Sequence, residues 1–228
     1  MIWIADACSN HSGSLDRALA LIDTAAEVGA SHVKFQLFNG EIGKKPEEWL
    51  PLEWLPKLQE RAHENHLQFG CSPFYLKAVE ELEPYVDFYK IAASQFNNRA
   101  LIEKCTEKSK PIYISQPPPY PKYNYKQEIM TLLLSHNCSW SFLYCIPKYP
   151  ALLAEVNLSQ MRRFHGYSDH TRLSGVIYRA VHHYNAEVIE FHLDLHDGEG
   201  WEFKYGHCWL PSEIKEVIDN VRDGFAAD

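Results

Sequence analysis

The sequence predicts an α/β protein folded as a (β/α)8 TIM barrel, with a single domain over residues 1–228. Short apolar runs rich in β-branched and aromatic residues alternate with longer amphipathic stretches, which is typical of repeated strand–helix units around a parallel sheet. Eight such runs can be counted, and 228 residues suit one α/β barrel better than two small domains. A doubly wound open sheet is the alternative, because the number of strands does not establish closure.

The expected strands are short, apolar and followed by polar residues. They cover residues 2–6, 32–37, 68–71, 88–92, 111–115, 141–145, 164–167 and 187–192. The expected helices cover residues 15–28, 53–65, 76–82, 99–107, 125–135, 154–162, 172–184 and 211–222. In the first helix, Leu15, Leu19 and Ile22 share one face. Ser14 is suited to cap its N-terminus and Gly29 to end it.

The composition excludes some classes of function. A formal net charge of −8 and an isoelectric point near 5.8 argue against a general binder of nucleic acids or anionic membranes, because such partners favour a basic face. The N-terminus lacks the basic segment of a signal peptide, and no stretch reaches the roughly 20 apolar residues that span a bilayer. We therefore expect a cytoplasmic protein whose partners are small molecules.

The six cysteines are scattered without paired spacing, and no CxxC motif is present. A disulfide framework is therefore not expected, and most of the cysteines are expected to be small core residues. Cys8 and Cys71 lie near strand ends, but no histidine–acid relay is evident beside either in the sequence. This disfavours a thiolate nucleophile.

Polar residues at the C-terminal ends of the strands are expected to converge on one face, where barrel enzymes carry their active sites. From the first strand to the last they are Asp6, Asn10, His11, Lys34, Gln36, Ser72, Lys90, Gln95, Ser115, Tyr149, Ser168, Asp169, His170, His192 and Asp194. Two long loops, 38–51 and 116–125, also follow strand ends and are expected on the same face.

Lys34 and Lys90 interrupt otherwise apolar strand patterns. An unpaired ammonium inside a strand core would cost several kcal/mol, so each lysine needs an anionic partner. One interpretation is a salt bridge to Asp6 or Glu190. The other is a phosphate or carboxylate ligand held between the two lysines and the hydroxyls of nearby serines.

His170 and His192 follow the seventh and eighth strands, which are neighbours in a barrel, and Asp169 and Asp194 lie close to them in sequence. Two imidazoles that converge on one point suit a divalent transition metal. In a chain with 12 histidines, a chance pairing or a structural hydrogen-bonding role is the alternative.

Eight segments of the chain resemble the sialic acid synthase family, whose members condense phosphoenolpyruvate with sugars of the N-acyl-mannosamine type. The segments are IADACSNHSG at 4–13, GASHVKFQLF at 29–38, FGCSPF at 69–74, DFYKIAASQ at 87–95, PIYIS at 111–115, YCIPKYP at 144–150, GYSDHT at 166–171 and EVIEFHLDL at 187–195. Their order and spacing agree with the family from residue 2 to about residue 222, and GYSDHT is the most specific of them.

The resemblance implies a reaction, a cofactor and a set of site residues. A divalent ion, Mn²⁺ with Mg²⁺ or Co²⁺ as alternatives, would polarise the sugar aldehyde; C3 of phosphoenolpyruvate would attack it, water would add at C2 and phosphate would leave. His170 and His192 would bind the metal; Lys34, Ser72, Lys90, Ser115 and Ser168 would hold phosphoenolpyruvate; Asn10, His11, Gln36 and Tyr149 would shape the sugar site; and Asp6, Gln95 and His192 would occupy catalytic positions.

The chain departs from the family pattern at Asp6, Ala93, Gln95 and Pro147, where members commonly have Glu, Ser, an acidic residue and Asn. Family members also continue into a C-terminal antifreeze-like domain that covers the active site of a dimer partner, and the expectation here is a barrel domain without it. The two long loops are therefore predicted to act as lids in its place, and a homodimer is a further expectation.

Two other functions stay open. The departures at Ala93, Gln95 and Pro147 are compatible with a homologue that binds phosphoenolpyruvate or phosphate and metal without turnover. The second of these alternatives is a divergent aldolase that uses Lys34 or Lys90 as a Schiff-base amine.

Overall fold

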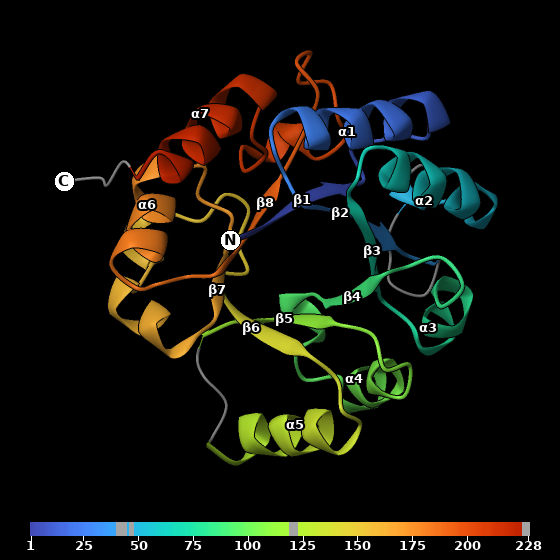
Figure 1. Cartoon of the computed structure of the whole chain (residues 1–228), viewed down its shortest axis with the longest axis vertical. Coiled ribbons are helices and arrows are strands. Elements are labelled where there is room, and N and C mark those ends of the chain that lie inside the picture. Colours follow the sequence, from blue (N-terminus) through green and yellow to red (C-terminus); the bar gives the residue numbers. More distant parts are fainter. Residues whose placement is uncertain (40–44, 46–47, 119–122, 225–228) are drawn as a thin grey trace.

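The computed structural model describes residues 1–39, 45, 48–118 and 123–224. Its strands are parallel and pair in chain order from β1 (Ile2–Cys8) to β8 (Val188–His192), and β8 pairs back onto β1. Figure 1 shows the resulting ring of strands with the helices around it. The predicted (β/α)8 barrel is confirmed, and the open-sheet alternative is wrong.

The strands agree with the predicted segments to within a few residues. Those between the first and the last are β2 (His32–Leu37), β3 (Gln68–Pro73), β4 (Phe88–Ile91), β5 (Ile112–Gln116), β6 (Trp140–Cys145) and β7 (Gly166–Asp169). β7 starts and ends two residues later than predicted, and because of the later end it includes Ser168.

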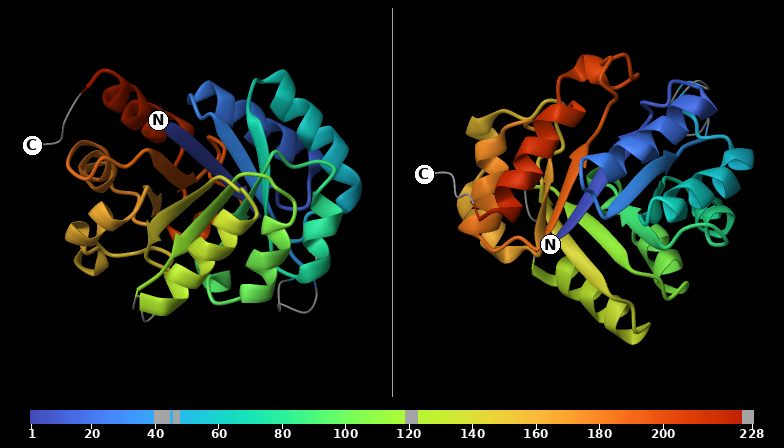
Figure 2. Two further views of the ribbon diagram at one scale, coloured as in Figure 1. Left: turned by 60° about the horizontal axis from the view of Figure 1, so that its bottom comes forward. Right: turned by 45° about the horizontal axis from the view of Figure 1, so that its top comes forward.

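The α-helices cover the outside of the barrel in both views of Figure 2. They are α1 (Leu15–Glu27), α2 (Leu55–Glu64), α3 (Leu76–Leu82), α4 (Arg99–Thr106), α5 (Tyr123–Ser135), α6 (Ser174–His182) and α7 (Pro211–Arg222). Ser14 caps α1 as predicted, since its Oγ accepts a hydrogen bond from the Arg17 N–H at 3.2 Å. In the described part of the chain, no helix has the length and apolarity needed to cross a membrane.

One predicted helix is wrong. Residues 154–162 form no α-helix but two 3₁₀ segments, η5 (Leu153–Glu155) and η6 (Leu158–Arg163). Val156, between them, is extended, and the Asn157 N–H donates to the Tyr144 hydroxyl at 2.9 Å. A tertiary hydrogen bond thus takes a backbone donor that a continuous helix would use, and it overrides the helical propensity of the segment.

The barrel interior is apolar at one end and polar at the other. Ile4, Phe88, Tyr113, Leu143 and Val188 fill the end where the strands begin. Because side chains on a strand alternate between faces, the next inward positions, two residues further along, are polar on most strands. They carry Asp6, Lys90, Ser115, Cys145 and Glu190. The fold therefore builds a polar layer directly above an apolar plug.

Candidate active site

The polar layer opens into a cavity of about 250 Å³ at the C-terminal mouth of the barrel. Its walls come from strand ends and from the loops that follow them: Asp6, Lys34, Gln36, Phe38, Phe74, Lys90, Ala92, Ala93, Ser94, Ser115, Cys145, Pro147, Tyr149, Ser168, His170, Glu190, His192, Glu202, Tyr205 and His207. The cavity thus brings together Lys34, Lys90, His170 and His192, which come from four different strands or strand ends.

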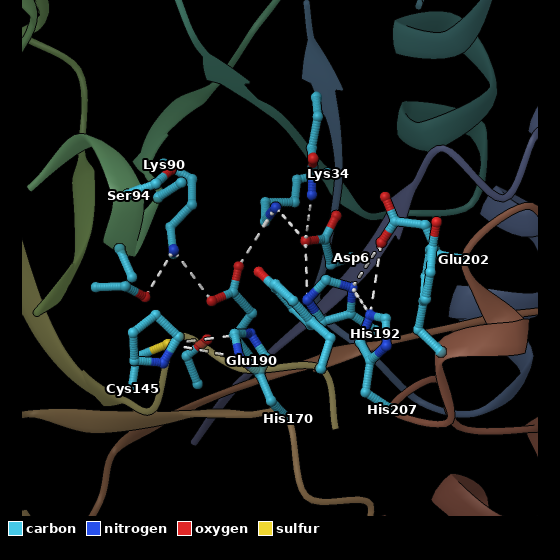
Figure 3. Close-up of a pocket in the computed structure, with 18 of the residues that line it drawn as sticks. Asp6, Lys34, Lys90, Ser94, Cys145, His170, Glu190, His192, Glu202 and His207 are labelled. Atoms are coloured by element: carbon cyan, nitrogen blue, oxygen red, sulfur yellow. Dashed lines mark hydrogen bonds and ion pairs between the residues drawn. The ribbon is translucent and has the colours of Figure 1, made fainter. Parts of the chain in front are cut away.

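Lys34 and Lys90 are both ion-paired and buried (Figure 3). Lys34 Nζ lies 2.5 Å from Asp6 Oδ2 and 3.4 Å from Glu190 Oε1, and Lys90 Nζ lies 3.1 Å from Glu190 Oε2. Lys90 also donates to Ser115 Oγ at 2.8 Å. The salt-bridge interpretation of the two lysines therefore agrees with the structure. Both ammonium groups also line the cavity, so an anionic ligand would meet the same two groups.

These ion pairs decide the charge of the groups involved. Burial disfavours the charged form of Lys34, but the carboxylates of Asp6 and Glu190 outweigh it and hold its pKa above the usual range. Burial likewise disfavours ionised Glu190, but Lys90 and Lys34 outweigh it and hold its pKa below the usual range. Lys34 is therefore an ammonium at neutral pH, which disfavours it as the Schiff-base amine of an aldolase.

The two histidines predicted to bind metal lie side by side, with ring centroids 5.1 Å apart. His170 Nδ1 donates to the carbonyl oxygen of Ile146 at 2.7 Å, which leaves Nε2 with its lone pair. Burial lowers the pKa of His170 well below the usual value, so the ring is neutral and able to act as a ligand. His192 Nε2 lies 3.6 Å from Asp6 Oδ2. Tyr149, half-exposed, lies against both rings.

The loop between β8 and α7 adds residues that were not assigned a role from the sequence. His207 Nε2 lies 3.2 Å from His192 Nδ1, and Glu202 Oε2 lies 3.6 Å from His192 Nδ1 and 3.5 Å from His207 Nε2. Figure 3 shows these three side chains gathered on one side of the pocket. The dipeptide His207–Cys208, a short distance after the last strand, is the sequence signal that would have pointed to them.

The same loop is held in place by long-range contacts. Asp194 accepts from Arg17 Nη2 at 2.7 Å and from the Gly200 N–H at 2.8 Å. A Cβ at Gly200 would lie 2.4 Å from Asp194 Oδ1, so this close approach requires glycine. Trp209 Nε1 donates to Asp169 Oδ2 at 2.9 Å. Asp169 and Asp194 therefore position the loop and do not line the cavity.

Four residues with predicted roles do not line the cavity. Asn10 is buried and donates to the carbonyl oxygen of Leu193 at 2.8 Å. His11 is buried nearby, and burial lowers its pKa to about 4. Ser72 Oγ lies 3.3 Å from Lys34 Nζ. Gln95 Oε1 accepts from Asn98 at 3.0 Å, at the end of η4 (Ala93–Gln95). In η4, Ala93 and Ser94 face the cavity instead.

The cysteines also differ from expectation. No relay was evident beside Cys8 in the sequence, yet its Sγ lies 3.3 Å from His192 Nδ1. Cys208 Sγ lies 3.8 Å from His207 Nε2. A hydrogen bond from Cys8 lowers the pKa of Cys208 to about 5, although burial opposes this. Burial lowers the pKa of His207, but hydrogen bonds with Cys208 and Glu202 outweigh it and raise the value to about 9. The fold brings Cys8 to His192 from the other end of the chain, whereas His207 and Cys208 are neighbours in sequence.

The predicted lids fall partly outside the described residues. Residues 40–44 and 46–47 of the first loop and 119–122 of the second are not described. Of the first loop, Phe38 lines the cavity and lies against Phe74, with ring centroids 4.4 Å apart. The lid role of the two loops stays a prediction.

Comparison with known proteins supports the resemblance seen in the sequence. The chain is 30% identical to N,N'-diacetyllegionaminic acid synthase of Campylobacter jejuni, with 96% of the chain and 75% of that protein covered. It is 28% identical to N-acetylneuraminate-9-phosphate synthase of Homo sapiens, with 96% and 68% covered. The predicted likeness to sialic acid synthases is confirmed, and with it the prediction of an enzyme.

A solved structure supports the fold. The N-acetylneuraminic acid synthetase of Leptospira borgpetersenii, solved in complex with citrate, superimposes with a TM-score of 0.87 at 24% identity. The match covers 97% of this chain and 82% of that one. The model of the NeuB family matches residues 41–227, which is most of the chain. With these matches, the barrel and its polar mouth identify the chain as a member of the NeuB family.

Proposed function

We propose that this chain is a synthase that condenses phosphoenolpyruvate with the aldehyde of an N-acyl-mannosamine-like sugar, giving a nonulosonic 2-keto acid. The observation that carries the proposal is the pair of buried ammonium groups, Lys34 and Lys90, on the cavity wall. Relatives named as legionaminic, pseudaminic and N-acetylneuraminate-9-phosphate synthases support the substrate class.

The lysine side of the cavity would hold phosphoenolpyruvate. Ser115 Oγ accepts from Lys90 and Ser168 hydrogen-bonds Glu190, so both hydroxyls already lie beside charged groups. An incoming phosphate or carboxylate would accept from the ammonium groups and hydroxyls together, which are the donors such oxyanions require. Ser72 would act through Lys34, whose Nζ it contacts, and not by direct contact with the ligand.

The histidine side fits a divalent ion. His170 presents Nε2 with its other nitrogen held by a carbonyl, the arrangement of a metal-bound imidazole, and His192 Nε2 and Asp6 lie beside it. Mn²⁺, Mg²⁺ or Co²⁺ bound there would polarise the aldehyde oxygen. Tyr149 and Gln36 lie on the wall where the sugar would enter, and Gln36 Nε2 donates to Asp6 Oδ2 at 3.1 Å.

The reaction consumes one water and releases one phosphate. A bond forms between C3 of phosphoenolpyruvate and the aldehyde carbon, the aldehyde oxygen gains a proton, water adds at C2 and the C–O bond to phosphate breaks. Asp6, Glu190 and Glu202 are the carboxylates on the cavity wall. We assign proton transfer to Asp6 and Glu190, which lie beside the two lysines that would hold phosphoenolpyruvate. Gln95 has no basic group and contacts Asn98, so its predicted catalytic position has less support.

A phosphate-release assay tests the proposal. With phosphoenolpyruvate, Mn²⁺ and N-acetylmannosamine or related aldehydes, we expect phosphate to appear only when all three are present. Tight phosphoenolpyruvate binding without phosphate release from a broad aldehyde panel would favour the non-catalytic homologue. Borohydride trapping of an imine would favour the aldolase. The expected homodimer, the single-domain extent and the cytoplasmic location stay predictions.

A further inference from the structure

Four ligand-type side chains meet at the edge of the cavity, where His192 and His207 form part of the wall, and the proposed function uses only one of the four. They are Cys8 at the end of β1, His192 at the end of β8, and His207 and Cys208 just before α7. Each has at most 3% of its surface exposed. The ligand atoms of Cys8, His192 and Cys208 all lie within 4.8 Å of one another.

The contacts centre on the nitrogen of His192 that faces away from Asp6. His192 Nδ1 lies 3.3 Å from Cys8 Sγ and 3.2 Å from His207 Nε2, and His207 Nε2 lies 3.8 Å from Cys208 Sγ. In a tetrahedral zinc site, bonds of about 2.0–2.3 Å place neighbouring nitrogen and sulfur ligands about 3.3–3.8 Å apart. The three contacts above, at 3.2, 3.3 and 3.8 Å, lie close to that range.

Hydrogen bonds alone do not satisfy all the polar atoms of these four side chains. His192 Nδ1 and His207 Nε2 face each other, so at most one of them donates to the other, while Cys8, Cys208 and Glu202 compete for the same hydrogens. One cation would satisfy the facing lone pairs of all four side chains at once.

The backbone at Cys8 is shaped for this contact. β1 changes register against β2 between Asp6 and Cys8, and Cys8 has φ of +39°, a conformation that favours glycine. This bulge turns a β-strand residue into the space beside His192. Strained backbone of this kind is retained where the surrounding structure or a function requires it.

We propose that Cys8, Cys208, His192 Nδ1 and His207 Nε2 form a closed site for a zinc-class divalent ion, with the Glu202 carboxylate beside it. Two thiolates and two imidazoles are a ligand set that selects zinc over Mn²⁺ or Mg²⁺. The ion would tie the ends of β1 and β8 to the loop before α7. It is distinct from the ion of the proposed function, which would contact His192 through Nε2 and His170.

The two sites are compatible, because an imidazole that loses its last proton can hold an ion on each nitrogen. The sulfur site also stands without the proposed function, since its ligands are defined by their own contacts. If the sulfur site does not exist, a bound metal will show no thiolate ligand. If the proposed function is wrong, no phosphate will be released from phosphoenolpyruvate.

Cobalt substitution tests the site on the intact chain. Protein stripped of metal and titrated with Co²⁺ is expected to bind about one tight equivalent, with a thiolate-to-cobalt charge-transfer band and strong tetrahedral d–d bands. Zn²⁺ is expected to displace the Co²⁺ and Mn²⁺ is not. Cys208→Ser and His207→Gln should each weaken Co²⁺ binding more than about 100-fold, with Cys208→Ser also reducing the charge-transfer band.

Two control variants show whether the thiolate-to-cobalt band comes from the proposed site. Cys145→Ser removes a buried thiol that lies 3.8 Å from His170 Nδ1 on the other side of the cavity, and His170→Gln removes the pocket ligand. Both should keep the thiolate band. A Co²⁺ spectrum without a thiolate band, or a band lost in Cys145→Ser and kept in Cys208→Ser, would overturn the proposal. Circular dichroism identifies folded variants, and His207→Gln, which keeps both thiols, decides the case if Cys208→Ser does not fold.

Discussion

The cavity has two sides that differ in how well their charges and hydrogen bonds are satisfied. On the lysine side, Lys34, Lys90 and Glu190 come from strands, and every one of these charged groups has an opposite charge within 3.4 Å. On the histidine side, His192 and His207 come from a strand end and a loop, and their facing nitrogens lie 3.2 Å apart. The lysine side is thus preorganised by its own ion pairs, whereas the facing nitrogens of the histidine side are where we propose that a cation binds.

Glu190→Gln tests the lysine side and should have the largest effect on stability. The change leaves Lys90 without its carboxylate and Lys34 with only Asp6, so we expect the free energy of unfolding to fall by about 3–5 kcal/mol. Urea denaturation at pH 7 measures it. Glu187→Gln, at an exposed position just before the same strand, is the control and should change stability little. Equal stabilities of the two variants would show that the lysine side is not a structural charge network.

The same network predicts a direction for pH dependence. The pKa of Glu190 is lower in the folded protein than in the unfolded chain, where it is about 4.3. Its contribution to stability is therefore fully present above that pH and is lost as the pH falls towards the folded value. We expect Glu190→Gln to lose less stability than the parent between pH 5 and about pH 3. A larger loss in the variant would contradict this origin.

Lys90→Gln tests the role of the lysine side in ligand binding. Loss of one charge-assisted contact should weaken phosphoenolpyruvate binding about 10- to 100-fold. Isothermal titration calorimetry on the folded variant measures the affinity. Lys77→Gln on α3, where the lysine is exposed, is the matched control. An unchanged affinity in Lys90→Gln would remove the phosphate-binding role from this side of the cavity.

Gly200→Ala tests the histidine side through the loop that carries it. The new Cβ would lie 2.4 Å from Asp194 Oδ1 and 2.6 Å from the Asn10 side chain, so the loop must shift. Such overpacking costs about 1–3 kcal/mol. Co²⁺ binding should weaken while phosphoenolpyruvate affinity stays close to that of the parent. Loss of both affinities to the same degree would mean that the two sides do not act separately.

Gly175→Ala serves as the counterpart and has the smallest expected effect. A Cβ at this position in α6 would meet nothing within 4 Å, and the helix keeps its backbone. We expect stability to rise by about 0.5–1 kcal/mol with both ligand affinities unchanged. Thermal and urea denaturation measure the change. If Gly175→Ala is less stable than the parent, α6 does not tolerate alanine. The effect of Gly200→Ala could then not be assigned to displacement of its loop alone.

Much of the fold and the lysine side followed from the sequence. The alternation of apolar runs and helices led to the closed barrel. Lysines inside apolar strands indicated anionic partners, and ion pairs with Asp6 or Glu190 were one of the two interpretations. These predictions rest on local periodicity, because the side chains of one strand alternate between faces whatever the rest of the chain does. The eight segments that resemble sialic acid synthases lie at the ends of the strands that carry the site, and the match to the NeuB family agrees with them.

The histidine side was decided by the tertiary structure. Arg17 and Asp194, which are 177 residues apart, anchor the loop that brings His207 to His192. The hydrogen bond from the Asn157 N–H to the Tyr144 hydroxyl also replaced a predicted helix with two 3₁₀ segments. The contact of Gln95 with Asn98, in contrast, is local, because the two residues are three positions apart. The sequence by itself determined which residues point into the barrel, since strand geometry is local. Only the folded chain determined which loop residues join them, because a loop's course depends on contacts with distant segments.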